Sequence, residues 1–473
     1  MTRAILWFRR DLRPDDLPAL HACASADAVI PLFVVDPAVL RTAGPNRRHF
    51  LAGALRALDG ELGGSLVLRR GDPRHVVPQV AGAAHAPLVV ATADFAPYGL
   101  RRDRAVARAL NAAGRSLLTV DSPYAVAPGN LRARSGAPFQ VFSAFRRAWA
   151  DHGWTRSAPM PSTRFTGAPG DATAEDIEMG VAEAGQWGLP SWWGGLPLGR
   201  AARLPQAGPA EARVRLERFA AGPLEAYAEE RDRPGVAGTS GLSPYLRFGC
   251  IHPRTVLERL GTGSGADQMR SELAWREFYA DLLWHRPDSA RRPLRAFGNH
   301  LRWDTGERAR DRFRAWATGR TGYPLVDAGM RQLLAEGWMH NRVRMVTASF
   351  LVKDLHIDWR LGARWFMWHL VDGDLASNQQ NWQWVAGVGT DAAPFHRVFN
   401  PRVQQERFDP EGGYVRRYLR EHPVPHADGL PDQLSSSGDL EPVVDHAHER
   451  RDALARFDEA RRLAAMEQGR SGP

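Results

Sequence analysis

Short apolar runs alternate with helical patterns through the first 120 residues of the chain. The apolar runs cover residues 4–8, 29–35, 66–68, 88–91 and 117–120. Between them, apolar residues recur at helical spacing over 47–62 and 101–113. Strands that alternate with helices predict βαβ units and a parallel sheet. We therefore expect a Rossmann-like α/β domain over residues 1–130, although no G-x-G-x-x-G fingerprint follows the first strand.

The pattern changes twice further along the chain. Residues from about 151 to 210 are rich in Pro, Gly, Ala and Ser, which predicts a connector wrapped over the surface, and we expect this connector over 131–210. Strand patterns then vanish, and helical periodicity predicts a larger all-helical domain over 211–430. Its expected helices are 214–227, 267–283, 308–316, 323–336, 342–353 and 360–370. A polar tail with one helical run, 445–468, completes the chain over 431–473.

Charge adds a class of partner to this outline. The net charge is +9, which suits a polyanion such as DNA. A GC-rich genome accounts equally well for the preference of Arg over Lys, but not for the excess of positive charge. The two cysteines, Cys23 and Cys250, make no disulfide framework or zinc site and predict a reducing, cytoplasmic compartment. We expect no signal peptide and no membrane span.

Several polar groups stand where a packed helix would not place them. Glu272, Trp275 and Tyr279 share one helical face, although a solvated Glu beside a core Trp fits equally well. Asp372 and Asp374 flank a glycine, and they could hold a cation, cap a helix, or accept from sugar hydroxyls and an arginine. No further ligand follows at metal spacing, so we expect no metal.

The small and hydroxylated residues of 238–249 predict a backbone nest for phosphates. Together with the paired carboxylates and the aromatic side chains, this nest predicts a nucleotide-like cofactor inside the helical domain. The stretch "NQQNWQW", residues 378–384, places a run of four side-chain amides before two indoles, a mixture untypical of both surface and core.

Five runs of sequence resemble class I cyclobutane pyrimidine dimer DNA photolyases of the photolyase/cryptochrome family. They are "TSGLSPYLRFG", "ELAWREFY", "TGYPLVDAGMRQL", "GWMHNRVRMVTASFLVKDLHIDWR" and "DGDLASNQQNWQW", and the resemblance runs from Trp7 to about Tyr418. It implies an α/β domain plus a helical domain that binds FAD, active as reduced FADH−. It also implies a lyase that uses light and one electron to split pyrimidine dimers in DNA, with no net redox change.

The same resemblance implies the residues that hold FAD. Asp372 would pair with Arg344, Asp374 would face the isoalloxazine edge, and Asn378 would sit at flavin N5. The full implied set is Tyr227, Thr239, Ser240, Gly241, Leu242, Ser243, Trp275, Asn341, Arg344, Asp372, Gly373, Asp374 and Asn378. Gln379, Gln380 and Asn381 depart from the family, which carries smaller residues there. This departure leaves the local turn and the immediate surroundings of the flavin open, but not the roles of the residues on either side.

Three tryptophans match the family's electron path from the flavin to the surface: Trp382, Trp359 and Trp303. Trp316 competes with Trp303 for the last position.

The implied substrate residues surround a flipped-out pyrimidine dimer. Glu272 and Asn341 would act on the lesion in catalysis, and two indoles would replace its lost stacking. The implied DNA-binding set is Arg231, Glu272, Trp275, Arg342, Met345, Trp384 and Arg397. The (6-4) class carries a histidine pair in this helix, whereas "MHNR" offers only His340, which favours cyclobutane dimers.

An antenna pigment is implied for the N-terminal domain. The segment 94–103, "DFAPYGLRRD", resembles members that bind 8-hydroxy-deazaflavin more than those that bind methenyltetrahydrofolate. Folate, a second flavin and an empty site stay open. The candidate contacts are Trp7, Phe8, Arg9, Arg10, Asp36, Arg48, Asp94, Tyr98 and Arg247.

Two other functions compete with light-driven repair. A blue-light receptor would share the fold, but the short tail and the presence of Glu272, Trp275, Asn341, Met345 and Trp384 favour repair. A plain nucleotide-binding regulator leaves the tryptophans unexplained. We therefore expect a monomeric enzyme that acts on UV-damaged DNA and is associated with the nucleoid when bound to it.

Overall fold

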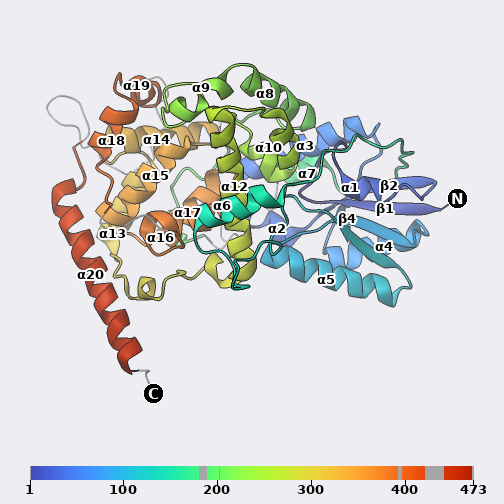
Figure 1. Ribbon diagram of the computed structural model, residues 1–473, viewed down its shortest axis with the longest axis horizontal. Helices are drawn as coiled ribbons and strands as arrows, with labels where there is room; N and C mark the ends of the chain where they lie inside the picture. Colours follow the sequence, from blue (N-terminus) through green and yellow to red (C-terminus); the bar gives the residue numbers. More distant parts are fainter. Residues whose placement is uncertain (1, 180–188, 202, 392–396, 421–440, 471–473) are drawn as a thin grey trace.

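The computed structural model describes residues 2–179, 189–201, 203–391, 397–420 and 441–470. An α/β part and a larger helical part lie side by side, with the sheet at one end of the molecule (Figure 1). Parts of the predicted connector (180–188 and 202), of the helical domain (392–396 and 421–430) and of the tail (431–440) lie outside the described residues. The domain boundaries given above stay predictions.

Five parallel strands form the sheet of the α/β part, in the order β3-β2-β1-β4-β5. Their bounds are β1 Arg3–Phe8, β2 Ala28–Val35, β3 Val67–Arg70, β4 Leu88–Thr92 and β5 Ser116–Val120. Each strand lies within two residues of its predicted bounds. β1 is central, because Ala4 pairs with Val29 on one side and with Leu88 on the other.

Helices cover both faces of this sheet, as parallel sheets require. They are α1 Pro18–His21, α2 Pro37–Leu40, α3 Pro45–Glu61, α4 Pro73–Ala83 and α5 Pro97–Ala112. The central strand is buried on both sides: Ile5 and Trp7 pack into one apolar cluster, and Leu6 and Phe8 into another. The predicted parallel α/β fold is therefore confirmed.

The predicted connector is not confined to the surface. It forms α6 Phe142–His152, α7 Ala174–Met179 and the short helix η2 Ser191–Trp193. Trp149 is buried and donates to Glu277 at 2.7 Å, and Trp193 is buried inside the helical core. Trp149 and Trp193 therefore belong to the core, which the Pro/Gly-rich composition of the segment did not indicate.

The helical part holds the elements that build the site. They are α8 Pro209–Ala221, α9 Pro223–Glu230, α10 Ser243–Phe248, α11 Pro253–Arg259, α12 Ser264–His285, η3 Pro287–Ala290, η4 Ala296–His300, α13 Glu307–Ala317, α14 Pro324–Glu336, α15 Asn341–Ser349, η5 Phe350–Asp354, α16 Trp359–His369, α17 Leu375–Ala386, α18 Pro401–Phe408 and α19 Gly413–Leu419.

Three helices differ from the sequence prediction. The expected helix 214–227 is broken at Gly222, because Pro223 cannot continue the hydrogen-bond ladder of α8. The expected helix 342–353 ends in a π-helical turn, η5. The amide-rich stretch, for which no helix was predicted, lies inside α17, so Gln379, Gln380 and Asn381 are helical.

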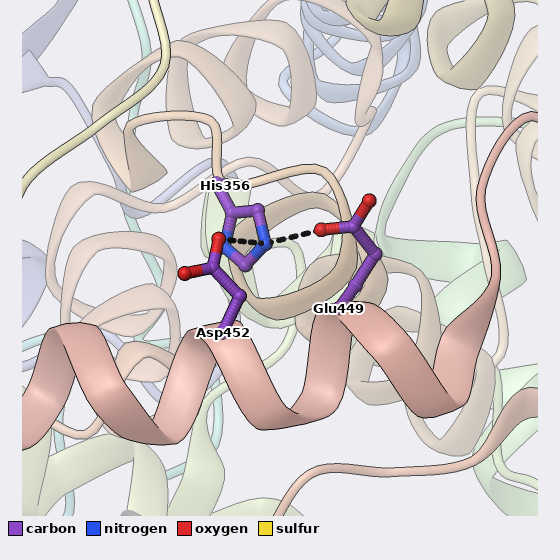
Figure 2. A group of neighbouring side chains, drawn as sticks. All are labelled: His356, Glu449 and Asp452. Carbon is purple, nitrogen blue, oxygen red and sulfur yellow. Dashed lines mark hydrogen bonds and ion pairs between the residues drawn. The ribbon is translucent and has the colours of Figure 1, made fainter.

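The last helix, α20 His446–Arg470, lies along the outside of the helical part (Figure 1). Figure 2 shows how its charged side chains hold it: His356 Nε2 lies 2.7 Å from Glu449 and 3.4 Å from Asp452. The same two carboxylates also pair with Arg312 and Arg456. Although these three side chains are close enough to share a cation, the two arginines already balance their charge. The group therefore serves to dock α20.

Within the described residues, no helix is long and apolar enough to cross a membrane.

Candidate active site

A cavity of about 450 Å³ opens into the middle of the helical part. Its walls come from α9, α10, α12, α15, α16, α17 and the loop before α17. This volume falls within the range of small-molecule and cofactor sites.

The cavity brings together residues predicted for two different ligands. From the predicted flavin set it is lined by Tyr227, Ser240, Leu242, Ser243, Trp275, Asn341, Arg344, Asp372, Gly373, Asp374 and Asn378. From the predicted DNA set it is lined by Arg231, Glu272, Trp275, Arg342, Met345 and Trp384. Thr239, Gly241 and Arg397 do not line it.

Asp372 is the centre of a polar cluster on one wall. Arg344 Nη2 lies 2.8 Å from Asp372 Oδ2, and the Ser243 hydroxyl donates to the same carboxylate at 2.6 Å. The Trp338 indole donates to Ser243 Oγ at 3.2 Å. Asp372 is only 8% exposed, so its charge is stabilised by these donors and not by water. The structure thus joins the pair that the resemblance implied.

Asp374 has a structural task besides lining the cavity. It caps α17, accepting from the Ser377 amide at 3.1 Å, and it pairs with Arg10 of the α/β part at 2.7 Å. Burial alone raises the pKa of Asp374, but Arg10, Arg247 and Arg276 together hold that pKa well below its usual range. The sequence left open whether the two aspartates hold a cation, cap a helix or accept from hydroxyls and an arginine. Asp374 caps a helix.

The side-chain amides of α17 turn out to have mostly structural partners. Gln380 donates to Ser289 Oγ at 2.8 Å, and Gln383 donates to the Ser289 carbonyl at 2.7 Å and accepts from the Leu294 amide at 2.9 Å. These bonds hold the segment after α12 against α17, a segment that would otherwise leave buried backbone groups unpaired. The amide-rich composition is thus explained largely by this contact.

Glu272 lies half-buried between two donors. Arg231 Nη2 is 3.0 Å away, and Gln268 Nε2 donates to it at 2.7 Å. Burial raises the pKa of Glu272, and the Arg231 charge offsets only part of that rise. A carboxyl group with a raised pKa can carry a proton into the cavity.

Aromatic side chains form the neighbouring wall. The Trp275 ring stacks on Phe142 of α6, with centroids 3.6 Å apart and planes at 9°. The Tyr279 hydroxyl donates to Asn381 at 3.3 Å. The stacking on Phe142 holds the Trp275 indole in one orientation, which no pattern within the 131–210 segment indicated.

Trp382 connects the cavity with an aromatic cluster below it. It is 2% exposed, its ring lies 5.0 Å from Phe366 and 6.3 Å from Trp316 between centroids, and it lines the cavity. Trp359 is also buried, and Trp303 is half-buried. Both competitors for the end of the predicted electron path therefore stay open, since Trp316 contacts Trp382 while Trp303 lies nearer the surface.

The predicted antenna residues are spread over two places. Tyr98 donates to Asp36 after β2, and Arg102 pairs with Asp94 at 3.1 Å after β4. Arg247 instead donates to the Gly373 carbonyl at 2.9 Å, on the wall of the large cavity. Arg48 is buried on α3. The antenna site stays a prediction.

Sequence reasoning missed part of the cavity wall. The missed members are Leu246, Met269, Leu273, Arg276, Trp338, Met339, Ala348, Phe366, Leu370, Ser377, Asn381 and Val385. Arg276 could have been found, because it directly follows Trp275 in the same motif. The apolar members follow ordinary helical periodicity and carry no signal of their own.

The parallel α/β topology and the large cavity in the helical part define a class of proteins that combine an α/β part with a helical part holding the ligand site. Residues 4–163 match the family model "DNA photolyase", and residues 269–459 match "FAD binding domain of DNA photolyase". Deoxyribodipyrimidine photo-lyases of Halobacterium salinarum and Streptomyces griseus are both 38% identical, over 97% and 98% of this chain and 99% and 100% of theirs. The chain belongs to the DNA photolyase family.

Solved structures agree with this assignment. A class III photolyase from Agrobacterium tumefaciens superposes with a TM-score of 0.82 at 33% identity, covering 98% of each chain. An archaeal photolyase from Sulfolobus tokodaii, described with two FAD molecules, superposes at 0.79 and 27% identity over 97% of this chain and 100% of that one. A Synechocystis cryptochrome superposes at 0.79 and 26% identity, over 96% and 99%. These comparisons support the predicted family, the FAD-binding helical domain and light-driven DNA repair. One cryptochrome is among the similar structures, but the photolyase relatives support repair better than the receptor alternative.

Proposed function

We propose that this chain repairs cyclobutane pyrimidine dimers in DNA, using light absorbed by bound FAD. The observation that carries the proposal is the single cavity in which Arg344, Asp372 and Asn378 share walls with Glu272 and Trp384. A cofactor and a pyrimidine dimer flipped out of the DNA duplex could meet there without a moving part between them.

The residues present fit a flavin nucleotide. Arg344 and Ser243 leave Asp372 able to accept from a ligand hydroxyl, and the cavity volume suits a cofactor. Bound FAD, when reduced, supplies the electron that light releases. The chain's own part is to orient both ligands, exclude water and hold a proton at Glu272.

Glu272 is proposed to hydrogen-bond the lesion. Its raised pKa favours a protonated carboxyl, which would donate to a thymine carbonyl as negative charge develops on the ring. The Arg231 contact at 3.0 Å keeps the group in place without removing the rise in pKa.

Arginines at the cavity mouth are proposed to contact the phosphates beside the lesion. Arg342 pairs with Asp232 and lies over Phe408, and Arg231 pairs with Glu272. Arg397 is exposed outside the cavity. Such contacts release counterions, so binding should weaken steeply with salt.

The lesion class is proposed from His340. This histidine caps α15, accepting from the Arg342 amide at 3.2 Å, and does not line the cavity. Burial lowers its pKa to about 4, so it stays neutral at physiological pH. It therefore offers no proton to a (6-4) lesion, which favours cyclobutane dimers.

The decisive experiment uses purified protein and an oligonucleotide that carries one thymine dimer. Blue light should restore the thymine absorbance, and darkness should not. An oligonucleotide with a (6-4) product is the matched control. If the protein binds flavin but repairs neither lesion, the repair proposal fails and the blue-light receptor becomes the better interpretation.

We also propose membership of class I, on the motif runs quoted above. A phylogenetic tree that contains class I and class III photolyases tests this. Grouping with the class III enzymes, of which the A. tumefaciens protein is one, would overturn it.

For the antenna we propose 8-hydroxy-deazaflavin, supported by the segment 94–103 and by the Tyr98–Asp36 contact. Mass spectrometry of pigments extracted from the protein, produced in a host that makes deazaflavin, is the test. A folate, or a second FAD as described for the S. tokodaii photolyase, would replace this proposal. We propose a monomer, to be checked by light scattering after gel filtration, that works in the cytoplasm on the nucleoid.

A further inference from the structure

One side chain of α17 bonds directly to an amide of the cavity wall. Asn378 Nδ2 donates to Gln379 Oε1 at 2.8 Å and to the Ala363 carbonyl at 3.0 Å. Gln379 Nε2 in turn donates to the Ala290 carbonyl at 2.6 Å. These three hydrogen bonds form a short chain, which we call the amide relay, from η3 through Gln379 and Asn378 to α16 behind the cavity.

The direction of this relay is fixed at both ends. A backbone carbonyl can only accept, so Ala290 requires the NH₂ group of Gln379 and Ala363 requires the NH₂ group of Asn378. With its NH₂ group directed at Ala290, Gln379 turns its oxygen toward Asn378. A reversed Asn378 amide would set its oxygen against two other oxygens.

Both N–H bonds of Asn378 are therefore used behind the wall. Within the described residues, no hydrogen bond reaches Asn378 Oδ1, and Asn378 lines the cavity. We infer that Gln379 is a positioning residue, which locks Asn378 so that it offers a hydrogen-bond acceptor, and not a donor, to the ring bound in the cavity.

This inference rests on the proposed function, with a flavin as the bound ring. A ring nitrogen of flavin takes up a proton when the ring takes up electrons, and an acceptor beside it favours the protonated form. Gln379 would thereby make the flavin hold that proton more tightly. It would act through Asn378, because Gln379 itself does not line the cavity.

Gln379→Met tests the inference, because it keeps the length of the side chain and removes both polar groups. Gln380→Met is the matched control: Gln380 lies on the same helix and also bonds η3, through Ser289 Oγ, but does not contact Asn378. The measurement is the midpoint potential for the first one-electron reduction of the oxidised bound flavin as a function of pH, in holoenzyme with equal flavin content. In this step the ring takes up one electron and, below its pKa, one proton from water.

In the wild type, the potential should fall with pH until the ring no longer takes up a proton. Gln379→Met should lower the pH at which this dependence ends by about half a unit, a roughly threefold loss of proton affinity. Gln380→Met should leave it in place. Superimposed curves for Gln379→Met and wild type, or an equal shift in Gln380→Met, would overturn the inference.

Gln379→Glu provides a second test if the Met variant loses its flavin. Its carboxylate still accepts from Asn378, so the proton affinity should stay at or above that of the wild type, and a lower value contradicts the inference. A wild-type protein that binds no flavin would instead refute the proposed function, so the two failures are distinguishable.

Discussion

The large cavity of the helical part and the crevice of the α/β part make different uses of charge. Doubly wound sheets bind ligands where the strand order reverses, here between β1 and β4. That crevice holds only about 10 Å³, against about 450 Å³ in the helical part. Its lining is Arg9, Arg10, Asp11, Thr92, Ala93, Asp94 and Pro123.

The crevice is closed by bonds within the chain. Arg9 pairs with Asp103 at 2.7 Å, and Asp11 accepts from the Thr92 hydroxyl at 2.6 Å. Arg10 reaches out of the α/β part to Asp374. The charged residues that line this crevice therefore pair with one another and with Asp374, whereas the larger cavity keeps its polar groups spread around open space.

Trp382→Phe should have the largest effect on function, and this effect should arise in the large cavity and not in the crevice. Light-driven reduction of oxidised flavin should be lost, because phenylalanine is far harder to oxidise than indole, while repair by chemically reduced enzyme persists. Absorbance of the flavin under blue light is the measurement. Fast photoreduction in this variant would place the electron path elsewhere.

Two companion variants locate the end of that path. If Trp303 ends it, Trp303→Phe should slow photoreduction and Trp316→Phe should leave it nearly unchanged. The reverse result would assign the role to Trp316, whose ring lies 6.3 Å from that of Trp382.

Asp372→Asn should weaken FAD binding roughly tenfold to a hundredfold, because hydrogen bonds to a charged group contribute about 1.5–3 kcal/mol. Equilibrium dialysis gives the dissociation constant. Asp11→Asn is the matched change in the crevice, and its affinity for FAD should equal that of the wild type. Equal losses in both variants would erase the distinction between the two regions.

Arg10→Ala should lower the free energy of unfolding by about 2 kcal/mol, since it leaves Asp374 with one fewer partner in a buried setting. Urea unfolding followed by tryptophan fluorescence measures this. Arg74→Ala removes an exposed ion pair with Asp72 and should have no measurable effect. A stable Arg10→Ala protein would mean that the Arg10 contact does not hold the two parts together.

Glu272→Gln should have the smallest effect, a twofold to tenfold change in repair per photon, about the contribution of one hydrogen bond. Burial raises the pKa of Glu272, so the wild type keeps its proton to a higher pH than an ordinary carboxyl group. Wild-type repair should therefore decrease as pH rises through that pKa, while the Gln variant, always neutral, shows no such decrease. Parallel pH profiles would remove the proton of Glu272 from the mechanism.

The fold could be read from the sequence wherever apolar periodicity is strong. The strands and the helices around α12, α14 and α16 lie within three residues of their predicted bounds. Helix α17 was not predicted, because its polar residues Gln380 and Gln383 face other protein segments and so interrupt the apolar periodicity on its buried side. The burial of Trp193 was also not predicted, because the core residues that it contacts lie far away in the sequence.

The sequence predicted the site correctly where the residues of one motif line the same cavity wall. Asp372 and Arg344 meet, as do the cavity carboxylate and indoles. The orientation of Asn378 was not readable, since it depends on Ala363 and Ala290, carbonyls that any sequence would supply. The small volume of the crevice could not be predicted either. It depends on pairs such as Arg9 with Asp103, whose members lie on different elements, and residue spacing along one strand does not show such pairs.

The bond between Arg10 and Asp374 also sets an order of assembly during synthesis. The two residues are 364 positions apart, so a ribosome that adds roughly 5–20 residues per second separates their appearance by about 20–70 seconds. During that interval the α/β part exposes an arginine without its final partner. Helix α17, which Asp374 caps and which lines the cavity, can therefore form its contact with Arg10 only after most of the chain has been made.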